Sequence, residues 1–244
     1  MILYPAVNLR MKAQSKKTVI LDILFIFMEV AAFTSLAYLT TLRSKNAEIA
    51  NLSLFGITIG LIGLAFQLMF WLGGILPCRL ILPPEESIKR LPFNIMTISL
   101  AAIFSFVLQF AMTFFGHSSI HDLYQWNPTY ANIFYCSMAI METLFFQLFI
   151  YRLIRFLLVD AMGRKSVIFG HDTKGPRQTY GVLIAIIGVA LAFGFGYHWV
   201  VYNGNLTWMS CAFIGCVFYN LLLEVTDFAV APSALHILNN WRPG

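Results

Sequence analysis

Five acidic side chains fall inside long apolar stretches of the sequence, where carboxylates are not expected. They are Asp22, Glu29, Glu142, Glu224 and Asp227. An ionised side chain at the centre of a bilayer costs about 2.5 kcal/mol or more, even on the most lenient insertion scale. Such groups usually face a partner, a hydrated cavity or a transport pathway. These acids are therefore the first candidates for functional residues.

The spacing of the acids predicts that several of them share helix faces. Asp22 and Glu29 are seven residues apart, and Asn220, Glu224 and Asp227 follow one another at i, i+4 and i+7. Residues at these intervals lie on one side of a helix. The functional interpretation is an acidic path for protons, cations or a small polar solute. The structural alternative is that the acids are hydrated at the membrane surface, or are protonated and only bridge helices.

Two arginines near the inner end of an apolar stretch offer countercharges. Arg152 and Arg155 could form ion pairs with Glu224, Asp227 or Asp22. Long basic side chains near helix ends also reach the lipid headgroups without any partner. Both interpretations remain open from the sequence.

A second group of residues suggests metal binding at the outer face. His117 and His121 are four residues apart, a spacing that lets two imidazoles share one metal ion on a helix. Asp122 and His198 could complete the site. The alternative is that they are ordinary polar residues at the membrane interface.

Small residues recur at intervals that favour close helix packing. In lipid, such residues let two helix backbones approach each other. They could pack helices within the chain or between chains of an oligomer. The glycines concerned are Gly56, Gly60 and Gly63 in the second apolar stretch and Gly188 and Gly196 in the fifth.

The elements that must position these residues are six apolar stretches. Each has about the 20 residues needed to cross some 30 Å of hydrocarbon as a helix, the structure that satisfies its own backbone in lipid. The chain is 59% hydrophobic and 11% charged, against about 25% charged in soluble domains. We predict an all-α, polytopic membrane helical bundle forming a single domain over residues 1–244. The predicted spans are residues 18–42, 52–78, 93–116, 131–158, 179–201 and 206–230.

The distribution of basic residues predicts the orientation. With the N-terminus inside, only Arg43 and Lys45 of the 16 lysines and arginines fall in outer loops. Basic residues favour the cytoplasmic side, so both termini are predicted to be cytoplasmic. The net charge of +5 fits contact with anionic membrane lipids and does not call for a nucleic acid.

Three functions fit these features, and no sequence motif selects among them. The first is a channel or carrier that uses the acidic path. The second is a non-catalytic subunit of a larger membrane complex, in which acids and arginines pair with partner helices or with further copies of the chain. The third is a membrane-embedded enzyme that modifies a lipid or depends on a metal ion at the outer histidines. H-E-x-x-H, C-x-x-C, Walker and G-x-S-x-G motifs are all missing from the sequence.

Overall fold

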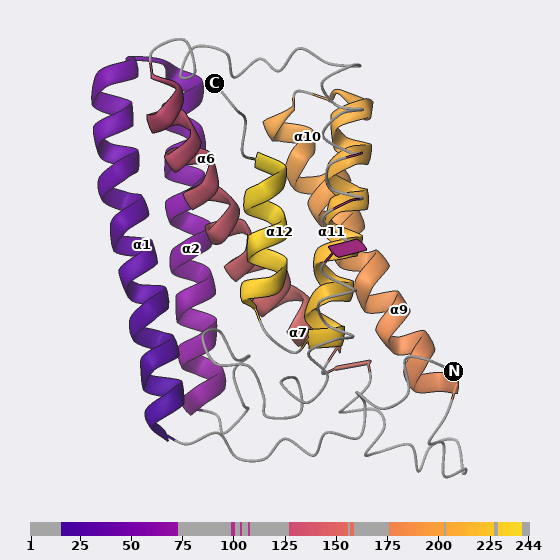
Figure 1. Ribbon diagram of the computed structural model, residues 1–244. Coiled ribbons are helices and arrows are strands. Elements are labelled where there is room, and N and C mark those ends of the chain that lie inside the picture. The colour runs from indigo at the N-terminus through magenta and orange to yellow at the C-terminus, as the bar shows by residue number, and fades with distance from the viewer. Residues whose placement is uncertain are drawn as a thin grey trace.

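The structure, a computed structural model, describes residues 16–72, 99–100, 103, 107, 127–155, 157–158, 176–202, 204–226 and 229–240. Within these ranges the secondary structure is helical, and η marks π-helical segments (Figure 1). The elements are α1 (Lys16–Ser44), α2 (Ala47–Leu72), α6 (Pro128–Glu142), η1 (Thr143–Tyr151), α7 (Arg152–Arg155), α9 (Pro176–Leu191), η4 (Ala192–Tyr197), α10 (His198–Val201), α11 (Leu206–Thr226) and α12 (Val230–Asn240).

The predicted polytopic helical bundle is confirmed. Five helical segments are long and apolar enough to cross a membrane, so the chain is an integral, multi-pass membrane protein. They are Ile20–Ser44, Ile49–Phe66, Pro128–Arg155, Tyr180–Val201 and Leu206–Glu224. The predicted span 93–116 lies almost entirely outside the described residues. Both chain ends also lie outside them, so their cytoplasmic location stays a prediction.

Local sequence signals explain where several helices begin. Asn127 precedes Pro128, and its side chain accepts a hydrogen bond from the Tyr130 N–H at 2.9 Å, which caps the start of α6. Asn205 caps α11 in the same way, accepting from two backbone N–H groups. Gly204, just before it, has a φ of 73°, which glycine adopts without steric cost. The turn between the last two long spans is thus encoded locally.

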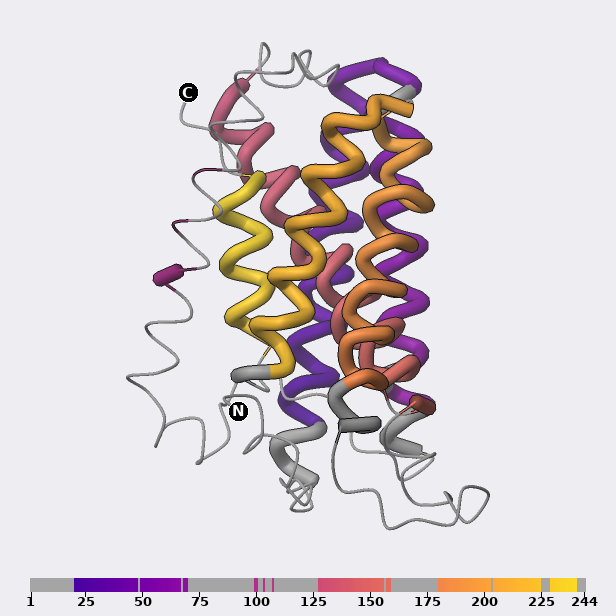
Figure 2. The backbone as a smooth tube through the Cα atoms, turned by 90° about the vertical axis from the view of Figure 1, so that its right-hand side faces the viewer, coloured from indigo at the N-terminus to yellow at the C-terminus, as the bar shows by residue number. Residues whose placement is uncertain are grey.

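One long helix, formed by α6, η1 and α7 in succession, is the centre of the bundle. It packs against α1 and α2 on one side and against α9, α11 and α12 on the other (Figures 1 and 2). In an apolar 18-residue window of its span Pro128–Arg155, 67% of the residues are buried, against 28% in the corresponding window of α1. Side chains on this helix are therefore the best placed to meet residues from several other helices.

The π-helical segment in this central helix changes which of its residues share a face. Glu142 and Arg155 are thirteen residues apart (155 − 142). In an α-helix of about 3.6 residues per turn, that distance is about 3.6 turns and leaves the two residues on nearly opposite sides. The wider turns of η1 over Thr143–Tyr151 reduce this rotation. Glu142 and Arg155 consequently both face the group of helices that contains α11.

The last described helix was not anticipated from the sequence. The final predicted span continued to residue 230, but α11 ends at Thr226 and α12 starts at Val230. α12 reverses direction and packs against α11 and α6 (Figures 1 and 2). Its 11 residues extend about 16 Å, roughly half the hydrocarbon thickness. α12 therefore brings residues near the end of the sequence to the middle of the bundle.

The glycines of α2 occupy the close contacts expected of them. A Cβ atom at Gly56 would lie 2.5 Å from the Met138 sulfur, and one at Gly60 would lie 2.6 Å from the Met141 sulfur. At Gly63 the nearest atom would belong to the backbone of Leu144, at 3.4 Å. These three glycines let α2 approach the central helix.

In the fifth predicted span, a glycine outside the predicted set makes the close contact within the chain, and packing at Gly188 and Gly196 stays a prediction for contacts with other chains. Within the described residues, nothing lies within 4 Å of a Cβ atom placed at Gly188 or Gly196. The close contact is made instead by Gly194, where a Cβ would lie 2.5–2.7 Å from backbone and Cβ atoms of Phe213. Gly194 lies in η4, whose π-helical turns shift the buried face away from α-helical spacing.

Candidate functional site

Glu142 lies at the centre of the bundle and is bound by residues from two other elements. It stands fourteen residues after Pro128 and thirteen before Arg155, the ends of its span, and is only 5% exposed. Its Oε1 accepts a hydrogen bond from the Tyr197 hydroxyl at 2.7 Å, and its Oε2 lies 3.1 Å from His236 Nε2. The buried carboxylate is therefore held between η4 and α12.

The second nitrogen of the His236 ring extends this network. Nδ1 lies 3.3 Å from the hydroxyl oxygen of Thr143, the residue after Glu142. With Nε2–H facing the carboxylate, a neutral ring accepts the Thr143 proton at Nδ1, and a charged ring donates to the same hydroxyl. In both forms the ring donates from Nε2 to the Glu142 carboxylate, so the Thr143 hydroxyl adjusts to either ring without a change in heavy-atom geometry.

A second buried histidine lies beside the same carboxylate. His198 follows η4 directly, and its Nδ1 is 2.9 Å from the Phe193 carbonyl oxygen. Because a carbonyl can only accept, Nδ1 must carry a hydrogen. Nε2 takes no part in this bond and has no hydrogen in the neutral ring. His198 also interacts electrostatically with Glu142. The site therefore combines one carboxylate with two imidazoles.

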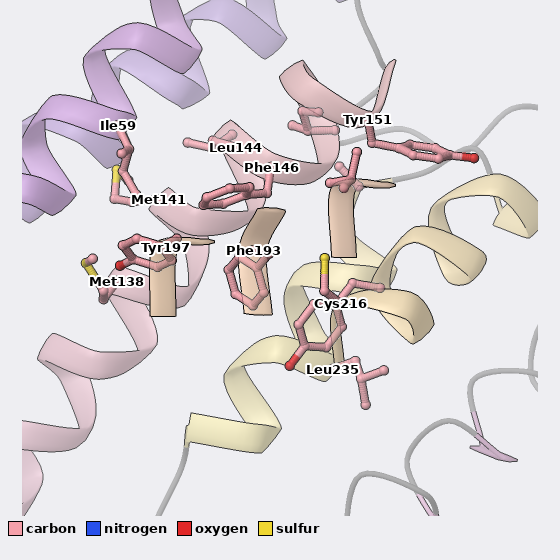
Figure 3. Close-up of a cluster of buried hydrophobic side chains, with 14 of the residues drawn as sticks. Ile59, Met138, Met141, Leu144, Phe146, Tyr151, Phe193, Tyr197, Cys216 and Leu235 are labelled. Carbon is pink, nitrogen blue, oxygen red and sulfur yellow. The ribbon is translucent and has the colours of Figure 1, made fainter. Parts of the chain in front are cut away.

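Aromatic rings enclose the two histidines. The Phe193 ring lies 4.3 Å from the His198 ring and 5.8 Å from the His236 ring, between centroids. Tyr219 stacks on His236 at 4.5 Å. Phe146 contacts Phe193, with centroids 4.8 Å apart (Figure 3). This apolar surrounding strengthens electrostatic interactions at Glu142, because little solvent screens them.

A second glutamate forms a similar cluster toward the C-terminal end of the central helix. Glu224 accepts two bonds from Arg155, with Nε to Oε2 at 2.8 Å and Nη2 to Oε1 at 2.9 Å. The Tyr151 hydroxyl also donates to Oε2 at 2.8 Å. The Arg155 and Glu224 side chains are only 13% and 9% exposed. Of the three acids that could pair with the arginines, the structure thus joins Glu224 to Arg155.

Between the two glutamates lies a third polar group. Gln147 Nε2 is 3.3 Å from the Cys216 sulfur, and Asn220 Nδ2 is 3.6 Å from the same sulfur and 3.3 Å from the Ile186 carbonyl oxygen. The amide oxygens of Gln147 and Asn220 are buried and have no hydrogen-bond partner among the described residues. A buried polar atom without a partner costs about 1–3 kcal/mol. This group therefore has unsatisfied capacity for hydrogen bonding.

The remaining predicted site residues are placed only in part. Asp22 is buried at 2% exposure, and Glu29 is half-buried on the same helix. Arg152 is half-buried one turn before Arg155. The other predicted residues lie outside the described part of the chain; they are Asp227, His117, His121 and Asp122.

Sequence reasoning missed several residues of this site. His236 was not a candidate because it follows the last predicted span. Tyr197 and Thr143 were not candidates because neither residue type is unusual in an apolar helix. The one available signal was the short segment 230–240, where an apolar face including Ala231 and Leu235 adjoins His236. That pattern predicts an amphipathic helix but does not show that it turns back into the bundle.

Comparison with protein-family models, with curated proteins and with solved structures gave no match to this chain. Among the described residues, no group of three or more His, Cys, Asp or Glu side chains is arranged to hold a metal ion. The metal site predicted at the outer face involves three residues outside that part, so it stays a prediction. The site's chemistry must be argued from its own geometry.

Proposed function

We propose that this protein is an intramembrane hydrolase that uses Glu142 to activate a water molecule. The substrate would be an amide or ester whose carbonyl group lies within the membrane, because the site sits at mid-span. This proposal corresponds to the third function that fits the sequence, a membrane-embedded enzyme. It places the chemistry on Glu142, His198 and His236, and not on the outer loop.

The observation that carries the proposal is the shared position of one carboxylate and two histidines deep in the bundle. A carboxylate is expensive at this depth, and apolar residues of similar volume often replace a buried ion pair without loss of stability. A site that needs only packing would not require His236 opposite Glu142. Two π-helical segments, η1 and η4, adjoin these residues, and such segments are frequent at functional sites.

The chemistry assigns a role to each side chain. Glu142 would accept a proton from water as the water oxygen forms a bond to the substrate carbonyl carbon. When the tetrahedral intermediate collapses, the bond to the leaving group breaks and the same proton passes to that group. His236 and Tyr197 hold the two carboxylate oxygens in place at 3.1 Å and 2.7 Å. His198, whose Nδ1–H is bound to the Phe193 carbonyl, would accept a hydrogen bond from the attacking water at Nε2 of the neutral ring.

The direct test compares two glutamate variants in proteoliposomes. The probes are a quenched fluorogenic transmembrane peptide and a fluorogenic phospholipid, which report amide and ester cleavage separately. Glu142→Gln should lower the rate of cleavage by at least about 100-fold, the usual contribution of a general base. Glu29→Gln is the matched control, since Glu29 is a half-buried glutamate on α1, a helix that supplies none of the residues of the site.

Two outcomes would overturn the proposal. One is that the wild-type protein cleaves neither probe. The other is that Glu142→Gln and Glu29→Gln lower the rate equally, which would mean that the loss reflects general damage to the fold. Thermal unfolding in detergent, measured on both variants, identifies such damage.

A second candidate function is the transport predicted from the acidic residues. It is favoured by the two amide oxygens without partners, at Gln147 and Asn220, which extend the polar region between Glu142 and Glu224. The contacts of Glu224 weigh against it, because that carboxylate accepts two bonds from the Arg155 guanidinium and one from the Tyr151 hydroxyl and so carries no charge left to bind a cation. A transport path predicts that Glu29→Gln and Glu142→Gln both reduce proton or cation flux into liposomes.

A further inference from the structure

The polar group around Cys216 lies fully inside the protein and is incompletely bonded. Gln147, Cys216 and Asn220 each have 0% exposure. Both amide nitrogens approach the Cys216 sulfur, while both amide oxygens lack a partner among the described residues. Exchanging N and O within either amide leaves N–H groups unsatisfied instead, so the deficit does not depend on that assignment. A group outside the described residues must complete these bonds.

The position of this group links the two glutamate clusters. Along the central helix, Gln147 follows Glu142 by five residues, one π-helical turn, and Tyr151 follows four residues later. On α11, Cys216, Asn220 and Glu224 recur every four residues and face the same helix. The distance from Cys216 to Glu224 along α11 is about 12 Å. Figure 3 shows the Cys216 sulfur pointing from α11 toward the central helix.

We propose that water molecules bind to the Gln147 and Asn220 amide oxygens and form a line from the Glu224 end of the bundle to Glu142. Buried water typically makes about three hydrogen bonds to polar atoms that would otherwise be unsatisfied. Two amide oxygens and a thiol provide suitable partners. The inference rests on the proposed function in one respect, since the water would be the co-substrate that Glu142 activates.

The charge at the end of this line favours water over a cation. Amide oxygens also bind cations well, so the carbonyl groups alone do not decide between them. Arg155 lies at the Glu224 end and is permanently protonated. Its guanidinium neutralises the Glu224 carboxylate through two hydrogen bonds, so this end of the line offers a cation no unpaired negative charge, whereas neutral water needs none.

The test measures how quickly the Cys216 thiol exchanges its hydrogen with solvent. In a variant in which Cys78, Cys136 and Cys211 are replaced by Ala, Cys216 is the only thiol, and its S–H stretching band disappears from the infrared spectrum as deuterium enters from D2O. A hydrated thiol should exchange as soon as the solvent is changed. Val189→Cys, made in a chain that lacks all four native cysteines, places a reference thiol at a fully buried apolar position and should exchange slowly.

Removing the side-chain amide of Gln147 or Asn220 should interrupt the proposed line of water molecules. Gln147→Met keeps the length of the side chain but removes its polar atoms, and it should slow exchange at Cys216 by about tenfold or more. Asn220→Leu should act in the same direction, and one of the two variants suffices if the other does not fold. Equal exchange rates at Cys216 and at the Val189→Cys thiol would overturn the proposal, as would no effect of either substitution.

The exchange measurement is independent of hydrolysis. Fast exchange in a protein that cleaves neither probe would retain the water line and reject the hydrolase. Slow exchange in a protein that cleaves a probe in a Glu142-dependent way would retain the hydrolase and reject the line.

Discussion

The two buried glutamates of the bundle are held by similar sets of partners that differ in one chemical property. Each carboxylate accepts a hydrogen bond from a tyrosine, Tyr197 for Glu142 and Tyr151 for Glu224. Each also contacts a nitrogen atom of a basic side chain. For Glu224 the base is Arg155, which contacts both carboxylate oxygens. For Glu142 it is a histidine ring, which contacts one oxygen.

This difference separates a fixed ion pair from a pair that can exchange a proton. An arginine in a protein stays protonated, so the Glu224 cluster has one charge state and serves to join two helices. The His236 ring instead has two nitrogens, of which one faces Glu142 and the other faces the Thr143 hydroxyl, so a proton can enter the ring on one side and leave on the other within an unchanged geometry. The comparison therefore assigns stability to one cluster and chemistry to the other.

The largest expected effect is on catalysis. His236→Leu removes the N–H group that holds one oxygen of the Glu142 carboxylate, whereas His236→Gln keeps an N–H donor within reach. The rate of probe cleavage should fall about 100-fold in His236→Leu, because a misplaced catalytic group loses about that factor, and much less in His236→Gln. Cleavage should be measured beside Glu29→Gln as the reference. Equal rates in the two His236 variants would show that this histidine does not position the carboxylate.

The largest expected effect on stability lies at the other cluster. Arg155→Ala leaves the Glu224 carboxylate buried without its countercharge, which should lower the free energy of unfolding by about 3–5 kcal/mol. Unfolding in detergent mixtures measures this loss. The double variant Arg155→Leu with Glu224→Leu should recover part of it, because no charge then remains unpaired. A double variant less stable than Arg155→Ala would contradict this account.

A smaller effect is expected from the glycines that pack the second half of the bundle. Gly194→Ala should lower the free energy of unfolding by about 1–3 kcal/mol, because the new methyl group meets the backbone of Phe213, which cannot rotate away. Gly188→Ala is the matched control, with open space around it, and should change stability by less than about 0.5 kcal/mol. Equal effects would indicate that Gly188 packs against a helix outside the described residues or against another chain.

The smallest expected effects come from the two tyrosines. Tyr151→Phe and Tyr197→Phe each remove one hydrogen bond to a carboxylate, so each should cost about 1.5 kcal/mol of unfolding free energy. Only Tyr197→Phe should also alter the pH profile of probe cleavage, since that hydroxyl binds Glu142. The proposed division between the clusters fails if Tyr151→Phe alters this profile and Tyr197→Phe does not.

The sequence predicted the parts of this molecule that depend on average hydrophobicity or on simple helix spacing. Continuous apolar stretches located the five spans that the structure describes. The α-helical spacing on α11 placed Asn220 and Glu224 on one face. Glu224 pairs with Arg155 of the central helix, and Asn220 donates to the Ile186 carbonyl of α9. The cost of a carboxylate in lipid was enough to mark Glu142 as unusual from its position in the sequence alone.

What could not be predicted depends on tertiary contacts with no local sequence pattern. His236 reaches Glu142 only because the chain reverses after α11, and the composition of segment 230–240 also fits a helix lying at the membrane surface. The π-helical turns are equally hidden, since we find no feature of residues 143–151 that distinguishes them from an α-helix. One such turn contains Gly194, the glycine of the fifth span that lies in close contact with α11 among the described residues.

The wide turns of η1 set the angle around the central helix between the residues of the two glutamate clusters. Deleting one residue within residues 144–150 removes about 100° of helical rotation, and relaxation of the remaining wide turns toward an α-helix restores a similar amount. Arg155 and Tyr151 would then keep facing Glu224, and Glu142, Tyr197 and His236 would stay together. A change in chain length by one residue, usually severe in a membrane helix, would here be absorbed without separating the two clusters.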